Sequence, residues 1–411
     1  MPATAKWTFM VYLAADNDLS RAAELDLAEM RRVGSSADVH VVVEIDRSGD
    51  APSRRHHIER DGADERVVDL GETDSGAPET LQAFVEWAID AYPAERYALV
   101  LWSHGSGWQP AEVRRIAAEA GVPDPEAEAE RSAGAVGRGV FFRSSLRTIL
   151  SLPSPEERAI CTDDGSGHSL DTVELGRVLG AVAERLGRPI DLLGMDACRM
   201  SNLEVCYQVR DHARVLVGSE VDVPGRGWPY DAVLAHLTAD PDQTPEALAA
   251  CVVDAFLSSH AARGEARPIA HAAFDLARIE DVAGPLDALA DALVGGMARG
   301  HVQSIWNAQR ASANFGGTTL WDVAHFCEAL CAATDDEAVV AAARAVRDAL
   351  APGTARFVLA EGRRGEALAR CGGLSIYLQP YTVDLSPYYA ELDFARDRRW
   401  HAMLRAYHGE G

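Results

Sequence analysis

The chain has 411 residues, of which 47% are hydrophobic and 25% charged, and these proportions exclude a disordered or collagen-like protein. Its 39 basic and 63 acidic residues give a formal net charge of -24, which argues against nucleic acid as a partner. No run approaches the roughly 18 apolar residues of a membrane-spanning helix, so no membrane partner is expected. Seven dispersed cysteines and the lack of a signal-peptide pattern predict a reduced, cytoplasmic protein without disulfides.

The first half of the chain alternates apolar strands with helices. Continuous apolar runs predict strands over 7–14, 39–45, 97–102, 190–195 and 214–218. Helical spacing of apolar residues predicts helices over 19–33, 78–92, 171–186 and 199–211. Residues 52–70 alternate in polarity around an Asp-Gly pair, which is typical of a hairpin. Strands of this kind, separated by helices, indicate a mainly parallel sheet covered on both faces.

Two further features divide the chain. Residues 109–160 hold an acidic stretch and seven arginines, and they interrupt the alternation as an inserted linker. Residues 240–411 are mainly helical, with candidate strands at 268–275, 355–360 and 372–378. We therefore expect a first domain over 1–239 and a helical or α+β region over 240–411 that packs on the first sheet or extends it.

Polar residues follow three of the predicted strands, at the sheet edge where parallel α/β proteins bind ligands. Asp16 and Asn17 follow the first strand, His104 follows the third and Cys198 the fourth. An imidazole beside a thiol is the pair that nucleophilic cysteine catalysis requires. The backbone N–H groups of Gly105 and Cys198 are candidates for stabilising an oxyanion. Cys198 is expected to open the helix over 199–211, whose dipole would lower the pKa of its thiol.

Acidic residues near Cys198 suggest a pocket for a cation. Asp196 lies two residues before the cysteine, where its carboxylate could pair with an Arg side chain, and less well with Lys. Glu220 and Asp222, in the Gly/Pro-rich loop over 219–228, either line the same pocket or are solvated loop charges.

Each of these residues also has a structural interpretation. Asp196 could instead cap the helix after it, Asp16 and Asn17 could cap the first helix, and Cys198 could be a buried structural thiol. No third catalytic residue is assigned.

Three segments carry a family resemblance: YALVLWSHGSGW, DLLGMDACRM and SEVDVPGRGW. They resemble the clostripain-like cysteine peptidases, which are family C11 of the caspase-like clan. The opening WTFMVYLAADNDL and the late GGLSIYL and YYAELDFARDRRW extend the resemblance over most of the chain.

The resemblance implies a caspase-like α/β fold, a mainly parallel central sheet flanked by helices with a C-terminal α+β extension. It implies a His104/Cys198 dyad and cleavage of protein or peptide substrates after a P1 Arg or Lys, with Asp196 at the specificity position. Members often cleave themselves between the His and Cys segments, which here would follow an Arg within 109–160 because this interval has no Lys.

Some relatives are secreted or depend on calcium, and this chain shows no export signal. Residues 162–168 are acidic but lack the full calcium-loop pattern, so no metal or other cofactor is expected and calcium is the weaker alternative. Cytoplasmic caspase-like proteases of bacteria often serve in defence or regulated proteolysis. The alternative function is a catalytically silent caspase-like scaffold or ligand-binding module, although AADND after the first strand is not a Gly-rich phosphate loop. The oligomeric state is not predicted.

Overall fold

The structure is a computed structural model. It describes residues 4–49, 51–62, 65–108, 160–164, 166, 168–315 and 319–410. The predicted linker over 109–160 lies outside the described residues except for Ile160, and so does any cleavage within it.

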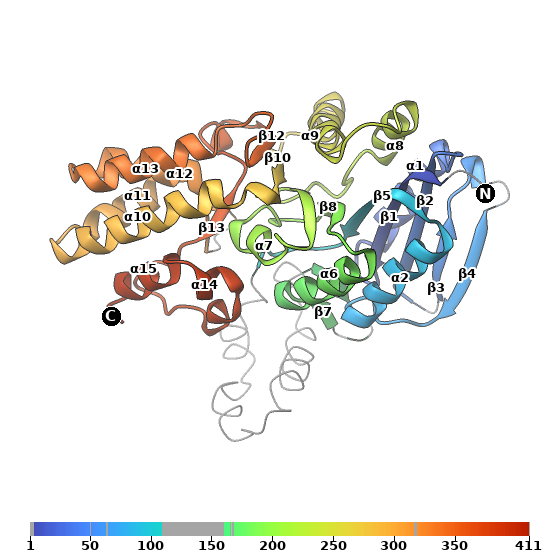
Figure 1. The fold of residues 1–411 in the computed structure, drawn as a ribbon, viewed down its shortest axis with the longest axis horizontal. Helices are drawn as coiled ribbons and strands as arrows, with labels where there is room; N and C mark the ends of the chain where they lie inside the picture. Colours follow the sequence, from blue (N-terminus) through green and yellow to red (C-terminus); the bar gives the residue numbers. More distant parts are fainter. Residues whose placement is uncertain are drawn as a thin grey trace, which may run out of the picture.

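A nine-stranded sheet runs through the described part of the chain, in the order β12-β10-β9-β8-β5-β1-β2-β3-β4 (Figure 1). Its strands are β1 (Ala5–Ala15), β2 (Val39–Arg47), β3 (Ser53–His57), β4 (Arg66–Gly71), β5 (Ala94–Trp102), β8 (Ile190–Asp196), β9 (Ala213–Gly218), β10 (Ile269–Asp275) and β12 (Val358–Arg364). The five strands β2, β1, β5, β8 and β9 are parallel, and antiparallel strands form both edges. The predicted parallel sheet and the hairpin at one edge are confirmed, and the carboxyl ends of the five parallel strands share one edge of the sheet.

Helices cover both faces of this sheet (Figure 1). One face packs against α1 (Ser20–Val33), α8 (Tyr230–Ala239) and α9 (Pro245–Ala262), and the other against α2 (Pro78–Ala91) and α6 (Thr172–Leu186). Alternate residues of β1 enter the two cores: Phe9 and Val11 one, Met10 and Tyr12 the other. Burial on both sides explains why the strands read as continuous apolar runs.

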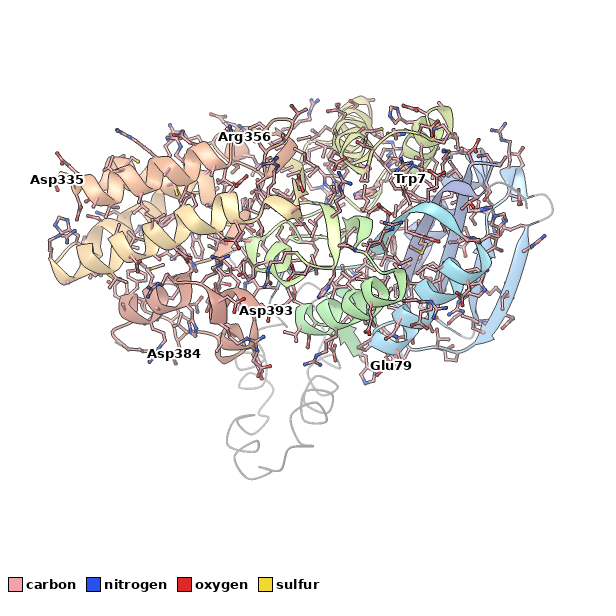
Figure 2. The ribbon with its side chains drawn as sticks, viewed as in Figure 1. Trp7, Glu79, Asp335, Arg356, Asp384 and Asp393 are labelled. Atoms are coloured by element: carbon pink, nitrogen blue, oxygen red, sulfur yellow. The ribbon has the colours of Figure 1, made fainter. Side chains whose placement is uncertain are left out.

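The region after residue 240 contributes strands β10 and β12 to the same sheet and adds a group of helices beside it (Figure 1). The helices are α10 (Glu280–Ala298), α11 (Val302–Ala311), α12 (Val323–Ala333), α13 (Glu337–Ala349), α14 (Asp393–Asp397) and α15 (Trp400–Tyr407), with the 3-10 turns η4 (Leu276–Arg278), η5 (Glu366–Leu368) and η6 (Pro387–Glu391). The strand predicted at 372–378 forms β13 (Ser375–Tyr377), which pairs with β11 (Leu320–Asp322) outside the main sheet. Side chains occupy the space between these layers (Figure 2).

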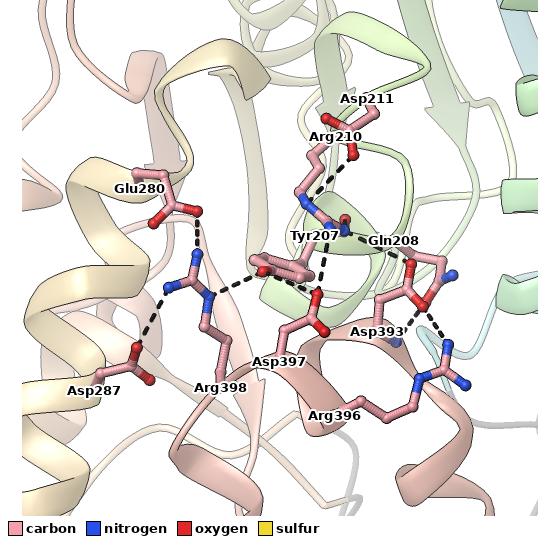
Figure 3. A network of polar contacts seen from close by, with 10 residues as sticks. All are labelled: Tyr207, Gln208, Arg210, Asp211, Glu280, Asp287, Asp393, Arg396, Asp397 and Arg398. Carbon is pink, nitrogen blue, oxygen red and sulfur yellow. Dashed lines mark hydrogen bonds and ion pairs between the residues drawn. The ribbon is translucent and has the colours of Figure 1, made fainter.

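A polar network holds the C-terminal segment against α7 (Leu203–Gln208) and α10 (Figure 3). The guanidinium of Arg398 donates to the Tyr207 hydroxyl (2.9 Å) and pairs with Glu280 and Asp287 of α10. Arg210 stacks on the Tyr207 ring, 3.8 Å from its centroid. Because Arg398 links Tyr207 of α7 to two carboxylates of α10, the late segment is fixed against both helices.

The remaining elements lie close to the carboxyl edge of the sheet or at its periphery. A short hairpin of β6 (Ile160–Asp163) and β7 (His168–Leu170) stands where the sequence suggested an acidic loop, and η1 (Arg60–Gly62) precedes β4. All seven cysteines are free, as predicted. None of the described helices combines the length and apolar character needed to cross a membrane.

Candidate active site

His104 and Cys198 follow neighbouring parallel strands at the same level. Trp102 at the end of β5 pairs with Asp196 at the end of β8, and each candidate residue lies two positions further along its chain. A Cβ atom on Gly105 would lie 2.5 Å from the carbonyl oxygen of Cys198, so the two loops touch through their backbones. The structure therefore brings the imidazole-bearing and thiol-bearing loops together at one edge of the sheet.

The His104 ring has an acidic partner that the sequence analysis did not identify. Its Nε2 lies 2.5 Å from Oδ1 of Asp18, which follows β1, and β1 pairs with β5. The Asp18 side chain is 62% exposed, whereas that of His104 is 19% exposed. The sequence did hold one indication of this role, the position of Asp18. It belongs to the polar cluster that follows β1, and β1 lies next to the strand that precedes His104. With Nε2 engaged, Nδ1 is the ring nitrogen available for proton transfer.

The Cys198 thiol is partly buried, and its surroundings favour the protonated form. Burial raises its pKa to about 11, with a further contribution from the nearby Asp222 carboxylate. A hydrogen bond from the Val223 N–H (3.3 Å) and the charge of Arg199 act in the opposite direction. A base and a bound substrate are therefore needed to generate the thiolate.

The prediction that Cys198 opens a helix over 199–211 is wrong. Cys198 lies in a turn, and α7 begins only at Leu203, after its N-cap Asn202. The intervening residues are held by other segments, since Ser201 N–H donates to the Ser219 carbonyl and Asn202 bridges to Ser375. A helix dipole therefore does not activate the thiol, and Asp196 is not the cap of this helix.

Asp196 lies behind the nucleophile and is buried. Its Oδ2 accepts hydrogen bonds from Trp228 N–H (2.9 Å) and the Tyr230 hydroxyl (3.1 Å). Its Oδ1 is buried without a hydrogen-bond partner among the described residues. Gly227 covers the carboxylate so closely that a Cβ there would lie 2.6 Å from Oδ2. Burial raises the Asp196 pKa to about 7, so the group is poised between its neutral and ionised forms.

The other two predicted pocket residues have different positions. Asp222 is 58% exposed and pairs with Arg199 of the Cys198 turn (Nε to Oδ1, 2.8 Å), so a cation of the chain itself already neutralises it. Glu220 is fully buried and faces Asp322 and Cys371, so in this conformation it offers no surface to a substrate.

The cluster of Glu220, Asp322 and Cys371 contains three ligand atoms within 4.8 Å of one another. Both Asp322 oxygens already accept backbone hydrogen bonds, from His325 (2.6 Å) and Gly372 (2.7 Å). Burial raises the pKa of Glu220 and of Asp322. These raised pKa values favour a protonated carboxyl group within the pair, so that two negative charges need not face each other.

Asn17 has a structural role next to the site. Its side-chain amide donates to the carbonyls of Ala14 (3.0 Å) and Thr162 (2.9 Å), and its Oδ1 accepts from the Leu19 N–H (3.0 Å). Asp16 is buried, and its carbonyl accepts from Asp164 N–H. Neither residue is the N-cap of α1, which is Leu19. Together they fix the loop that carries Asp18 to the β6 strand.

Comparisons with known proteins agree with this arrangement. The sequence model of the Clostripain family matches residues 11–119 and 150–406. Clostripain of Hathewaya histolytica is 24% identical over an alignment of 265 residues. The alignment covers 57% of this chain and 42% of clostripain, so it spans less than half of that relative.

Two solved structures resemble the chain over nearly its whole length. One is an inactive zymogen C11 protease from Parabacteroides distasonis, with a TM-score of 0.67 and 18% identity over 97% of this chain and 99% of that one. The other is a secreted C11 cysteine protease from Bacteroides thetaiotaomicron in complex with an irreversible peptide inhibitor, with a TM-score of 0.63 and 18% identity over 95% and 98% of the two chains. The fold is therefore the one that these caspase-like proteases share.

Proposed function

The chain belongs to the clostripain family of cysteine peptidases, and on that premise we propose that it is an endopeptidase that cleaves after Arg and less readily after Lys. The observation that carries the proposal is the equal register of His104 and Cys198 on adjacent parallel strands, with the carboxylate of Asp196 behind them.

In this mechanism, the Cys198 sulfur attacks the carbonyl carbon of the scissile bond. Its proton passes to Nδ1 of His104, while Asp18 holds the ring through Nε2. The N–H groups of Gly105 and Cys198 stabilise the oxyanion. Protonated His104 then gives the proton to the leaving amine. A water molecule, deprotonated by His104, attacks the thioester carbonyl. The C–S bond breaks to release the product acid, and His104 returns the proton to the Cys198 sulfur.

Asp196 is the proposed acceptor for the substrate guanidinium. Its Oδ1 has no hydrogen-bond partner among the described residues, and an ion pair with Arg would favour its ionised form. Because Gly227 lies directly against the carboxylate, binding in this mode requires that Gly227 shift. Asp196→Asn is expected to lower kcat/KM for Arg substrates about a hundredfold, and an unchanged preference for Arg would assign specificity elsewhere.

The first test compares Cys198→Ala with Cys251→Ala, a second partly buried free cysteine on α9. Hydrolysis of fluorogenic Arg peptides should disappear only in Cys198→Ala, with an unchanged unfolding temperature. Full activity in Cys198→Ala would exclude the mechanism.

We also propose self-cleavage after an Arg within 109–160. Intact-mass measurement of the wild-type chain and of Cys198→Ala, each with and without calcium, would give the cleavage site and any metal dependence together. Two fragments in the wild-type sample alone would support self-cleavage. An intact wild-type chain that still hydrolyses Arg peptides would contradict it.

A catalytically silent scaffold is the second candidate, favoured by the high pKa of the Cys198 thiol. An Arg chloromethylketone distinguishes the two functions, because it alkylates a cysteine only where the guanidinium and the thiol are correctly placed. A label mapped to Cys198 supports the peptidase, and an unlabelled chain supports the scaffold.

A further inference from the structure

A basic surface cavity of about 580 Å³ lies beside the proposed catalytic loop. Its charged lining consists of three arginines, Arg226, Arg263 and Arg267, with one carboxylate, Glu265. The buried ring of His260 completes the polar lining. This excess of positive charge occurs in a chain whose formal net charge is -24. A local concentration of arginines against that background favours an anionic ligand.

The cavity is directly connected to the nucleophile. The turn at 224–226 that forms one wall follows Val223, whose N–H donates to the Cys198 sulfur (3.3 Å). Arg267, another residue of the lining, lies within electrostatic range of Cys198 and Asp222. A side chain bound in the cavity would therefore belong to a substrate residue close to the scissile bond.

The three arginines differ in how far the chain itself neutralises them. Arg267 pairs with Glu265 (3.2 Å), and Arg263 pairs with Glu29 (3.4 Å). Arg226 is exposed and forms no hydrogen bond or ion pair with any residue that the structure describes. It is thus the cation that a ligand can engage without breaking an existing pair.

His260, one of the residues that line the cavity, joins two of the segments around it. The buried ring of His260 lies on α9 and its Nε2 is 3.1 Å from the carbonyl oxygen of Gly227, so the turn at 224–227 is tied to this helix. The same Gly227 covers Asp196. The cavity and the proposed Arg pocket therefore lie on opposite sides of one short turn.

We infer that this cavity is a subsite for an acidic side chain of the substrate, a Glu or Asp within three residues of the scissile bond, held chiefly by Arg226 with support from Arg267. The inference rests on the proposed endopeptidase function and extends it, because it adds a second charged determinant to the P1 Arg. A carboxylate meeting a guanidinium in a partly enclosed cavity gains a charge-assisted hydrogen bond.

The chain offers a suitable probe, since residues 127–135 read Ala-Glu-Ala-Glu-Arg-Ser-Ala-Gly-Ala. A quenched fluorescent peptide of this sequence is compared with peptides that carry a single Glu at each position within three residues of Arg on either side, each with a Gln peptide as its control. At the favoured position, Glu should raise kcat/KM about tenfold over Gln, and the difference should shrink in high salt.

Arg226→Glu should abolish this preference, so that the Glu and Gln peptides are turned over at rates within about twofold of each other. The matched control is Arg344→Glu, which makes the same charge change at an exposed arginine of α13 and should alter nothing. Equal turnover of all Glu and Gln pairs by the wild-type chain would overturn the subsite, as would an Arg226→Glu effect that is the same on both peptides.

Binding to Cys198→Ala, measured by fluorescence anisotropy, separates the subsite from the catalytic proposal. If no peptide is cleaved but the Glu peptide binds about tenfold more tightly than its Gln control, the catalytic proposal fails and the cavity still selects acidic ligands. If peptides are cleaved after Arg without any preference for Glu, the catalytic proposal stands and the subsite fails. Cleavage after Glu would show that the cavity binds the P1 residue itself, and it would overturn the inference that the acidic residue flanks a P1 Arg.

Discussion

Nε2 of His104 and Oδ1 of Asp18 lie 2.5 Å apart, although the two residues are separated by 86 positions in the chain. The contact exists because β1 and β5 are adjacent and parallel, so their carboxyl ends bring both loops to the same edge. It engages Nε2 and leaves Nδ1 as the other nitrogen of the ring. Asp18 is therefore a positioning residue for the proposed base.

Asp18→Asn should lower kcat about tenfold with little change in KM, since a neutral amide orients the ring less firmly than a carboxylate. The effect should be smaller than that of a buried aspartate in a catalytic triad, because Asp18 is exposed and solvent screens its charge. Steady-state kinetics beside Asp38→Asn, an exposed control, would check this. An unchanged kcat would remove Asp18 from the mechanism.

Gly105→Ala should impair catalysis far more than folding. The new Cβ would lie 2.5 Å from the Cys198 carbonyl oxygen and 3.1 Å from its nitrogen, which forces the two loops apart. A displacement of this kind should cost about a hundredfold in kcat. Gly284→Ala, on α10, is the matched control, because no atom lies within 4 Å of a Cβ at that position. Equal activities of the two variants would show that the loops tolerate separation.

Alkylation of Cys198 by iodoacetamide should accelerate with pH and reach half its maximum near pH 11, since burial disfavours the thiolate. Asp222→Asn should lower the midpoint, because the Asp222 charge raises the thiol pKa and its removal also releases Arg199. Rates at pH 8 should then rise several-fold, whereas Asp335→Asn, an exposed change on the distant helical region, should leave them unchanged. A midpoint near neutrality in the wild-type chain would contradict the buried, protonated thiol.

Asp196 should make the stability of the chain depend on pH. Its pKa is raised to about 7 in the folded state, so the unfolded chain releases this proton first, and stability from this group is lost as pH rises from about 4 to about 7. Asp196→Asn cannot ionise, and its unfolding temperature relative to the wild-type chain should therefore rise over this window and remain level above it. Calorimetry from pH 4 to pH 8 measures the unfolding temperatures of both chains. If the variant's advantage over the wild-type chain falls as pH rises, the pKa of Asp196 is not raised by folding.

The sequence by itself determined the features that depend on local pattern. Apolar runs and helical periodicity predicted the parallel sheet. The ends of the runs placed His104 and Cys198 at one edge, because strands separated by helices run parallel and end on the same side. The family resemblance rested on segments at those same strand ends. The predicted helix start at residue 199 was wrong because it depended on distant contacts. Ser201 and Asn202 bond to segments remote in sequence and not to the next helical turn.

Only the tertiary structure decided which side chains meet. Strand order paired Asp18 with His104, although Asp16 and Asn17 follow the same strand. Packing of the C-terminal region buried Glu220 against Asp322, and an arginine of the nucleophile's own turn neutralised Asp222. The arginines of the cavity come from a turn after β9 and from the segment between α9 and β10, which only the fold brings together. Such pairings depend on distances between segments far apart in the chain, and a local pattern of residue types does not encode them.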